Sequence, residues 1–106
     1  MQPRREVKTN PTAQPSNIEL ELMISNTMRR ELNDPSSYSP IGTRIARHPE
    51  GFAYVHEFRA KNGFGALVKD SWGFLYSTNH SSWTFYTRDA LPDLLKDITI
   101  DPDLVK

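Results

Sequence analysis

The sequence predicts an α+β domain: one N-terminal amphipathic helix packed on a curled antiparallel meander of three to four strands, with a short C-terminal helix. Three observations predict this class. Apolar residues recur at helical spacing before residue 33, and later segments alternate apolar and polar side chains. Turn-forming proline, asparagine and glycine separate the alternating segments. A length of 106 residues fits a single domain.

The chain divides into three parts by composition. Proline, basic and polar residues dominate residues 1–15, which we expect to form a disordered arm because they can bury little apolar surface. Residues 16–98 carry the periodic segments and form the expected domain. Residues 99–106 are expected to be an extended tail.

The helix is expected from Ser16 to about Leu32. Ser16 and Glu19 have the spacing of a capping box, in which each side chain accepts a hydrogen bond from the other residue's backbone N–H. Proline at position 35 disfavours a helical conformation at Asp34 and so ends the helix. Met23 is expected to lie outside the apolar face, which comprises Ile18, Leu20, Leu22, Ile24, Met28 and Leu32.

Alternation predicts four strands, over residues 41–47, 52–60, 64–77 and 82–87, and a short helix is expected over residues 91–95. The reversals fall at residues 48–51, at Asn62-Gly63 and at residues 78–81. Asp70 interrupts the apolar parity of the third strand, which predicts a bend or bulge there.

Parity also predicts the two faces of the sheet. One face lies under the helix and carries Phe52, Tyr54, His56 and Phe58. The other is expected to be solvated, because it carries Arg44, Glu57, Arg59 and Lys69.

Composition excludes several function classes. Thirteen basic and thirteen acidic side chains give zero formal net charge, so the broad positive field typical of nucleic-acid binders is missing. The chain has no cysteine, which excludes disulfides and thiolate chemistry. No spacing of histidines or carboxylates indicates a metal site, and no phosphate loop or nucleophile elbow is present. We therefore expect no cofactor, no metal and no catalytic residue.

The helix ends in Leu32-Asn33-Asp34-Pro35-Ser36-Ser37-Tyr38, and the second hairpin contains Arg59-Ala60-Lys61-Asn62-Gly63-Phe64-Gly65. These two segments resemble a family of short uncharacterised bacterial and phage-associated domains. The resemblance covers roughly residues 18–76, and the hairpin segment is its more specific part. It implies a fold but no activity, and it implies that many members are exported parts of small envelope proteins. The aromatic segment 82–87 and the acidic C-terminal end depart from the family pattern.

Location depends on the true N-terminus. No apolar run is long enough to span a membrane, and residues 1–10 lack the apolar segment of a signal peptide. We expect a soluble protein, cytoplasmic as the sequence stands and exported if a leader has been removed.

The leading hypothesis is a non-enzymatic interaction or structural domain. Arg59, Lys61 and Asn62 form the candidate binding patch, with Arg44 and Arg47 nearby; the alternative is that Arg59 pairs with Glu57 or Asp70. Trp83 and Tyr86 are further candidates, on a last strand that could be an open edge. The expected partner is a protein or a second copy of the chain, met by this strand or by the Met23 side of the helix.

A pocket between helix and sheet is the competing hypothesis, for a small-ligand-binding or enzymatic domain. Its polar lining would be Tyr54, His56 and Asp70. Binding of single-stranded nucleic acid on the aromatic face is disfavoured by the neutral charge and by the helix that covers this face.

Overall fold

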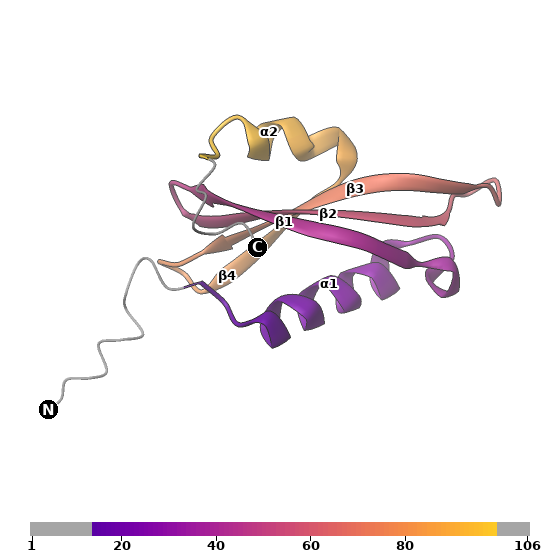
Figure 1. The fold of residues 1–106 in the computed structure, drawn as a ribbon, viewed down its shortest axis with the longest axis horizontal. Coiled ribbons are helices and arrows are strands. Elements are labelled where there is room, and N and C mark those ends of the chain that lie inside the picture. The colour runs from indigo at the N-terminus through magenta and orange to yellow at the C-terminus, as the bar shows by residue number, and fades with distance from the viewer. Residues whose placement is uncertain (1–13, 100–106) are drawn as a thin grey trace, which may run out of the picture.

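The sheet at the centre of the computed structural model is an antiparallel meander with strand order β1-β2-β3-β4 (Figure 1). The structure describes residues 14–99. Two 3₁₀ helices, η2 (Pro35–Ser37) and η3 (Arg88–Ala90), lie in the connections. The main elements are α1 (Asn17–Glu31), β1 (Ser39–His48), β2 (Gly51–Lys61), β3 (Leu67–Ser77), β4 (Ser82–Tyr86) and α2 (Leu91–Leu95).

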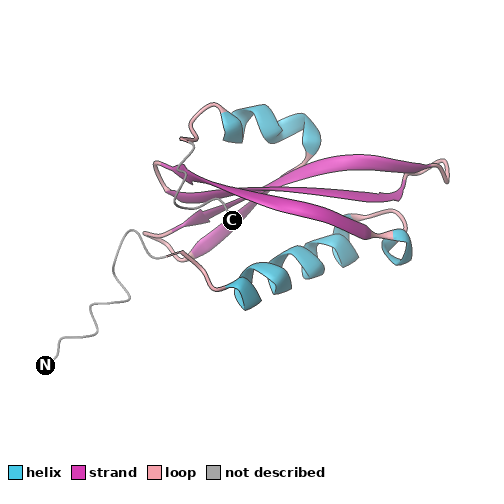
Figure 2. Cartoon of the chain, viewed as in Figure 1, coloured by secondary structure: helices cyan, strands magenta, loops and turns pink. Residues whose placement is uncertain are grey.

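The two helices cover opposite faces of the sheet (Figure 2). This arrangement confirms the predicted fold class, including the short C-terminal helix. Under α1 lies the larger core, of Ile24, Met28, Phe52, Tyr54, Phe58, Ala60, Trp72 and Phe74. Under α2 lies a smaller core, of Ala53, Leu75, Leu91 and Leu94. The face that we expected to be solvated is therefore covered where α2 packs on it.

The orientation of α1 differs from the predicted one. Ser16 caps the helix as expected, since its hydroxyl accepts the Glu19 N–H at 3.1 Å. The second half of the capping box is not formed among the described residues; the Glu19 carboxylate instead accepts the indole N–H of Trp83 at 3.4 Å. Met23 packs against the larger core. Ile18 and Leu22, which were assigned to the buried face, are 72% and 58% exposed.

The bulge lies in a different strand from the one predicted. Pairing between β2 and β3 is continuous from Gly51 opposite Ser77 to Lys61 opposite Leu67, with no shift at Asp70. The irregularity falls in β1 between Pro40 and Gly42. Proline has no N–H to give to a ladder, and proline in sheets is confined to such sites. Asp70 stays in register and forms an ion pair with Arg88 of η3.

The ends of the chain extend beyond the described residues. The expected disordered arm falls largely on residues 1–13, and most of the expected tail on residues 100–106, so both lie outside the described structure. Thr99 is described, and it forms a bridge to Arg47 of β1. Among residues 14–99, neither helix is long and apolar enough to cross a membrane.

Candidate interaction surfaces

The loop between β2 and β3 is held by its own hydrogen bonds. The Asn62 side-chain oxygen accepts the N–H groups of Phe64 (2.9 Å) and Ala66 (3.1 Å). Main-chain bonds join Asn62 N–H to Ala66 O and Gly65 N–H to Asn62 O. Positive φ occurs at Gly65 (82°) and not at Asn62 or Gly63, so the predicted two-residue Asn-Gly reversal is wrong. The Asn62 side chain therefore shapes the loop, and its amide oxygen already accepts two hydrogen bonds.

This fixed loop exposes apolar side chains. Phe64 is 97% exposed, and Leu67 and Val68, which follow it at the start of β3, are 60% and 37% exposed. We call residues 59–69 the hairpin tip. It forms the end of the sheet farthest from β4 (Figure 1). The Phe64 side chain contributes nothing to the core, so core packing does not explain why a phenylalanine stands at this position.

Three cations share one face of the hairpin tip. Arg59 stands directly opposite Lys69 across the β2–β3 ladder, and Lys61 lies two residues farther along β2. Residues two apart in a strand project on the same side. No carboxylate of the described chain lies within ion-pair distance of any of the three. Like charges directly opposite one another in a sheet are unfavourable, and a bound anionic group would relieve that repulsion.

The alternative pairings of Arg59 are not formed. Asp70 lies on the other face of β3 and bonds Arg88, with Nε 2.8 Å from Oδ1. Glu57 is not within ion-pair distance of Arg59. Arg44 and Arg47 stand opposite Val55 and Phe52, away from the hairpin tip. The third cation beside Arg59 and Lys61 is therefore Lys69, and not Arg44 or Arg47 as expected.

The two segments that carry the family resemblance meet at the base of the hairpin tip. The Ser37 hydroxyl accepts the Lys61 N–H at 2.8 Å and itself donates to the Asp34 carbonyl at 2.7 Å. A Cβ on Gly63 would lie 3.9 Å from the Asn33 side-chain nitrogen. The turn that ends α1 therefore supports the hairpin beside the exposed loop.

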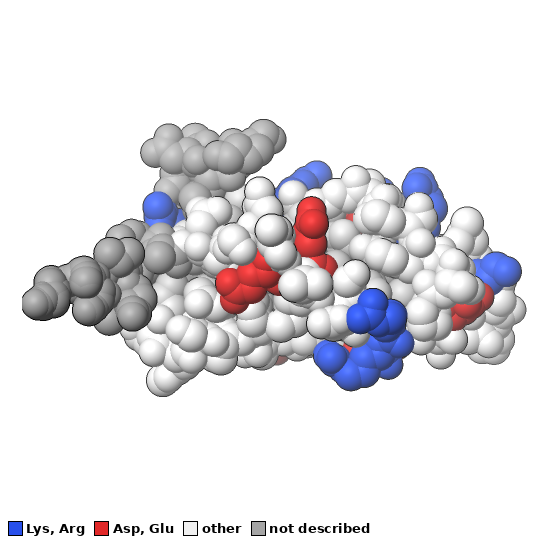
Figure 3. Space-filling view, turned by 90° about the horizontal axis from the view of Figure 1, so that it is seen from below, with Lys and Arg blue, Asp and Glu red and all other residues white. Residues whose placement is uncertain are grey.

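Charge elsewhere is mixed. Viewed from the α1 side, acidic and basic side chains are interspersed and do not form a field of one sign (Figure 3). Among residues 14–99, Arg44 and Lys96 also have no carboxylate partner within ion-pair distance, so the hairpin tip is distinguished only by having three such cations on one face.

The residues of the alternative pocket do not all line one cavity. Tyr54 borders a groove between α1 and β1, His56 borders the adjoining groove, and Asp70 lines a small cavity of about 110 Å³ near the end of α1. Burial raises the pKa of Tyr54 above its usual range, and the nearby Glu19 carboxylate and Tyr76 raise it further. His56 is 3% exposed, and both ring nitrogens have hydroxyl partners.

Trp83 and Tyr86 lie on opposite faces of β4. The Trp83 ring is half-buried and packs on Tyr54 and Tyr76, with ring centroids 5.6 Å and 5.0 Å away. Tyr86 packs against the smaller core under α2. They therefore do not form one aromatic surface. Within residues 14–99, no group of three or more histidine or carboxylate side chains could hold a metal ion.

The exposed large hydrophobic residues fall into two sets. One belongs to the hairpin tip. The other, which we call the β1 flank, consists of Ile18, Leu22, Ile41 and Leu95. The sequence predicted Phe64 at the start of the third strand, and Ile18 and Leu22 on the buried face of the helix. A five-residue loop with glycine at its fourth position was the signal for an exposed Phe64.

Comparison with protein-family models, with curated proteins and with solved structures gave no match.

Proposed function

We propose that this chain is a non-enzymatic protein-interaction domain whose hairpin tip binds an acidic partner surface. The single observation that carries the proposal is the 97% exposed Phe64 on a loop fixed by hydrogen bonds. Aromatic side chains and arginine are typical anchors of protein interfaces, and a fixed loop loses little entropy on binding.

The three cations define the chemistry of the partner. Arg59, Lys61 and Lys69 would meet carboxylates at the rim, while Phe64 and Leu67 enter an apolar pocket. Rim charges mainly raise the association rate and make it dependent on salt, whereas a buried aromatic anchor slows dissociation. The proposal thus assigns different kinetic roles to the two kinds of residue.

The turn that ends α1 supports the hairpin tip, because the Ser37 hydroxyl accepts the Lys61 N–H, and this support agrees with a binding role. The pocket hypothesis has weaker support, since Asp70 lines a different cavity from Tyr54 and His56, and His56 has no free ring nitrogen.

The test is site-specific photo-crosslinking in an extract of the source organism, followed by measurement with the purified partner. A benzophenone side chain at position 64 should capture one protein, and the same group at the exposed Thr84 on β4 serves as the matched control. With that partner, Phe64→Ser should weaken binding at least tenfold through a faster off-rate. Replacing Arg59, Lys61 and Lys69 by alanine should slow association and flatten its salt dependence.

Three results would contradict the proposal. The first is equal capture from positions 64 and 84, and the second is a partner whose affinity is unchanged by Phe64→Ser. The third is binding of the hairpin tip to vesicles of anionic phospholipid with no protein captured, which would assign the tip to membranes.

A further inference from the structure

The outer edge of β1 carries main-chain groups without partners among residues 14–99. Arg47 shows which way they point: its N–H donates to Thr99 O (3.0 Å) and its C=O accepts the Thr99 N–H (2.9 Å), away from β2. In an antiparallel ladder, alternate residues direct both groups to the same side. The main-chain N–H and C=O groups of Ile45 and Thr43 therefore also point away from β2. The described chain ends at Thr99, opposite Arg47, and so does not reach them.

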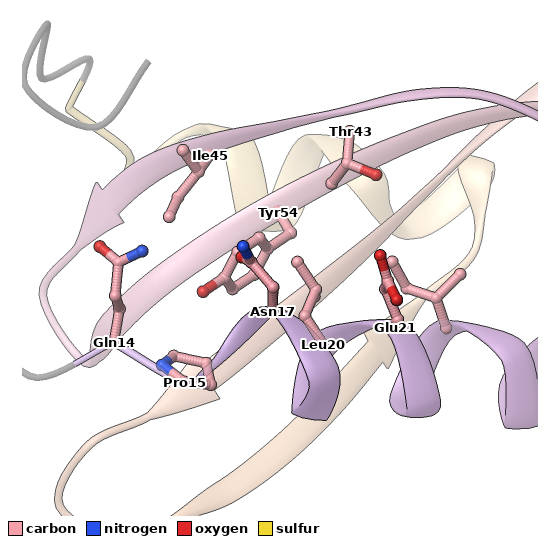
Figure 4. Close-up of a pocket in the computed structure, with 9 residues that line it drawn as sticks. Gln14, Pro15, Asn17, Leu20, Glu21, Thr43, Ile45 and Tyr54 are labelled. Carbon is pink, nitrogen blue, oxygen red and sulfur yellow. The ribbon is translucent and has the colours of Figure 1, made fainter. Parts of the chain in front are cut away.

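A groove runs along this edge on the α1 side. Two adjoining cavities of about 300 and 470 Å³ share Glu21, Ile24 and Thr43 in their lining. Figure 4 shows the Glu21 carboxylate directed from α1 toward β1, with Thr43 and Ile45 on the opposite wall and Tyr54 on the floor. Glu21 is exposed and has no cationic partner among the described residues.

A second cavity lies on the other face of the same strand. It has a volume of about 220 Å³ and a mostly apolar lining, of Arg44, Ile45, Ala46, Ala53, Val55, Leu95 and Ile98. The edge of β1 thus has a groove containing a carboxylate on one face and an apolar cavity on the other. Successive side chains of a strand added at this edge would enter the two in turn.

The β1 flank surrounds this edge. Glu21 and Ser25 of α1 line the grooves, and Ile18 and Leu22 lie three residues before them on the same side of the helix. Ile41 is in β1 itself, and Leu95 lines the apolar cavity. An added strand would cover part of this exposed apolar surface.

We propose that the edge of β1 binds an extended polypeptide segment of a partner protein as a fifth, antiparallel strand. The main chain of this segment forms hydrogen bonds with the main chain of Thr43 and Ile45. Its apolar side chains enter the cavity under α2, and a basic side chain on the opposite face forms an ion pair with Glu21. The pairing of Thr99 with Arg47 shows that this edge accepts a main-chain partner with two hydrogen bonds. This site lies apart from the hairpin tip and does not depend on the function proposed for it.

The test uses the full chain and a short synthetic peptide that alternates lysine and valine, followed by NMR. The Thr43 and Ile45 amides should shift on titration, and their hydrogen exchange should slow. The matched peptide is N-methylated on the amides that face β1, and it should bind about tenfold more weakly because two main-chain hydrogen bonds are lost.

Charge provides the second comparison. A peptide alternating glutamate and valine should bind at least severalfold more weakly than the lysine peptide, and Glu21→Gln should remove this preference. Glu21 is exposed, so the substitution leaves the core intact.

Three results would overturn the proposal. The lysine peptide could leave both amides unperturbed, or the N-methylated peptide could bind equally well. The amides could also already be protected without peptide, which would mean that a second copy or the chain's own C-terminal segment occupies the edge.

Discussion

The hydroxyl of Tyr38 lies 2.7 Å from Nε2 of His56, and the hydroxyl of Thr43 lies 2.8 Å from Nδ1 of the same ring. His56 is thereby held between the turn after α1 and the strand β1. Its ring also stacks on Phe58, with centroids 5.8 Å apart. Burial lowers the pKa of His56 and raises that of Tyr38, so both side chains remain neutral near pH 7.

Acid should destabilise the fold through His56. The unfolded chain takes up a proton near pH 6.5, whereas folded His56 takes it up only at lower pH because its pKa is lowered. The contribution is fully present above pH 6.5 and is lost as the pH falls toward the folded pKa. Within that window the free energy of unfolding should drop by up to about 1.4 kcal/mol per pH unit.

Urea unfolding at several pH values measures this slope. His56→Gln should flatten it, whereas replacing the exposed His80 with glutamine should leave it in place; an unchanged slope in His56→Gln would refute the assignment.

Removing one partner of the histidine should also be costly. Tyr38→Phe keeps the ring against Phe58 and deletes only the hydroxyl, so Nε2 loses its partner in a buried position. We expect a loss of about 1–3 kcal/mol in the free energy of unfolding. Tyr76→Phe is the comparison, because no side-chain hydrogen bond of the Tyr76 hydroxyl is seen within residues 14–99. Equal effects of the two substitutions would argue against the Tyr38–His56 bond.

The Ser37–Lys61 bond should control the order of the hairpin tip. Ser37→Ala removes the acceptor of the Lys61 N–H and should cost about 1 kcal/mol. The Lys61 amide should then exchange with solvent faster, while amides in the centre of β2 should not. Ser36→Ala, which loses only an exposed bond to Asp34, serves as the control. Uniform acceleration of exchange throughout β2 would contradict the local role.

Glycine at position 65 should be required by backbone conformation, in contrast to glycine at 63 in the same loop. Gly65 has φ 82°, which L residues rarely adopt, so Gly65→Ala should cost about 1–2 kcal/mol. Gly63 is not at positive φ, and an added Cβ would make only an ordinary contact. Thermal unfolding of the two variants should therefore separate them, and a greater loss for Gly63→Ala would overturn the loop geometry.

Close packing of α2 should make Gly73 intolerant of a side chain. A Cβ there would lie 2.6 Å from Leu91 Cδ1 and 2.7 Å from Leu94 Cδ2, so these packed leucine side chains of α2 would have to shift. Gly73→Ala should destabilise the fold by about 1–3 kcal/mol. Gly42→Ala, where nothing lies within 4 Å of the added Cβ, should be nearly neutral. Urea unfolding distinguishes the two, and similar values would mean that α2 does not pack on β3 as described.

Elements and faces were predictable because they depend on local periodicity. Period-two alternation correctly placed Phe52, Tyr54 and Phe58 on the face that α1 covers. The helix was harder, because a broad apolar face on a helix is compatible with several rotations. Only packing against the sheet selected Met23 over Leu22.

The candidate site was only partly predictable. Arg59 and Lys61 were identified from their shared parity, but Lys69 joins them only through the β2–β3 register. Phe64 was assigned to a strand because the loop was taken as two residues long. The side-chain hydrogen bonds of Asn62 lengthen it to five, which removes Phe64 from the ladder.

The sequence by itself determined the order of elements, the alternation that separates the two faces of the sheet, and the exclusion of cysteine chemistry. These properties follow from residue type and from spacing along the chain. Only the tertiary structure decided that His56 is enclosed by two hydroxyls, that three cations lie on one face of the hairpin tip, and that cavities flank both faces of β1. Those relationships join residues distant in the chain, and they depend on strand register and helix rotation, which packing of the whole core fixes.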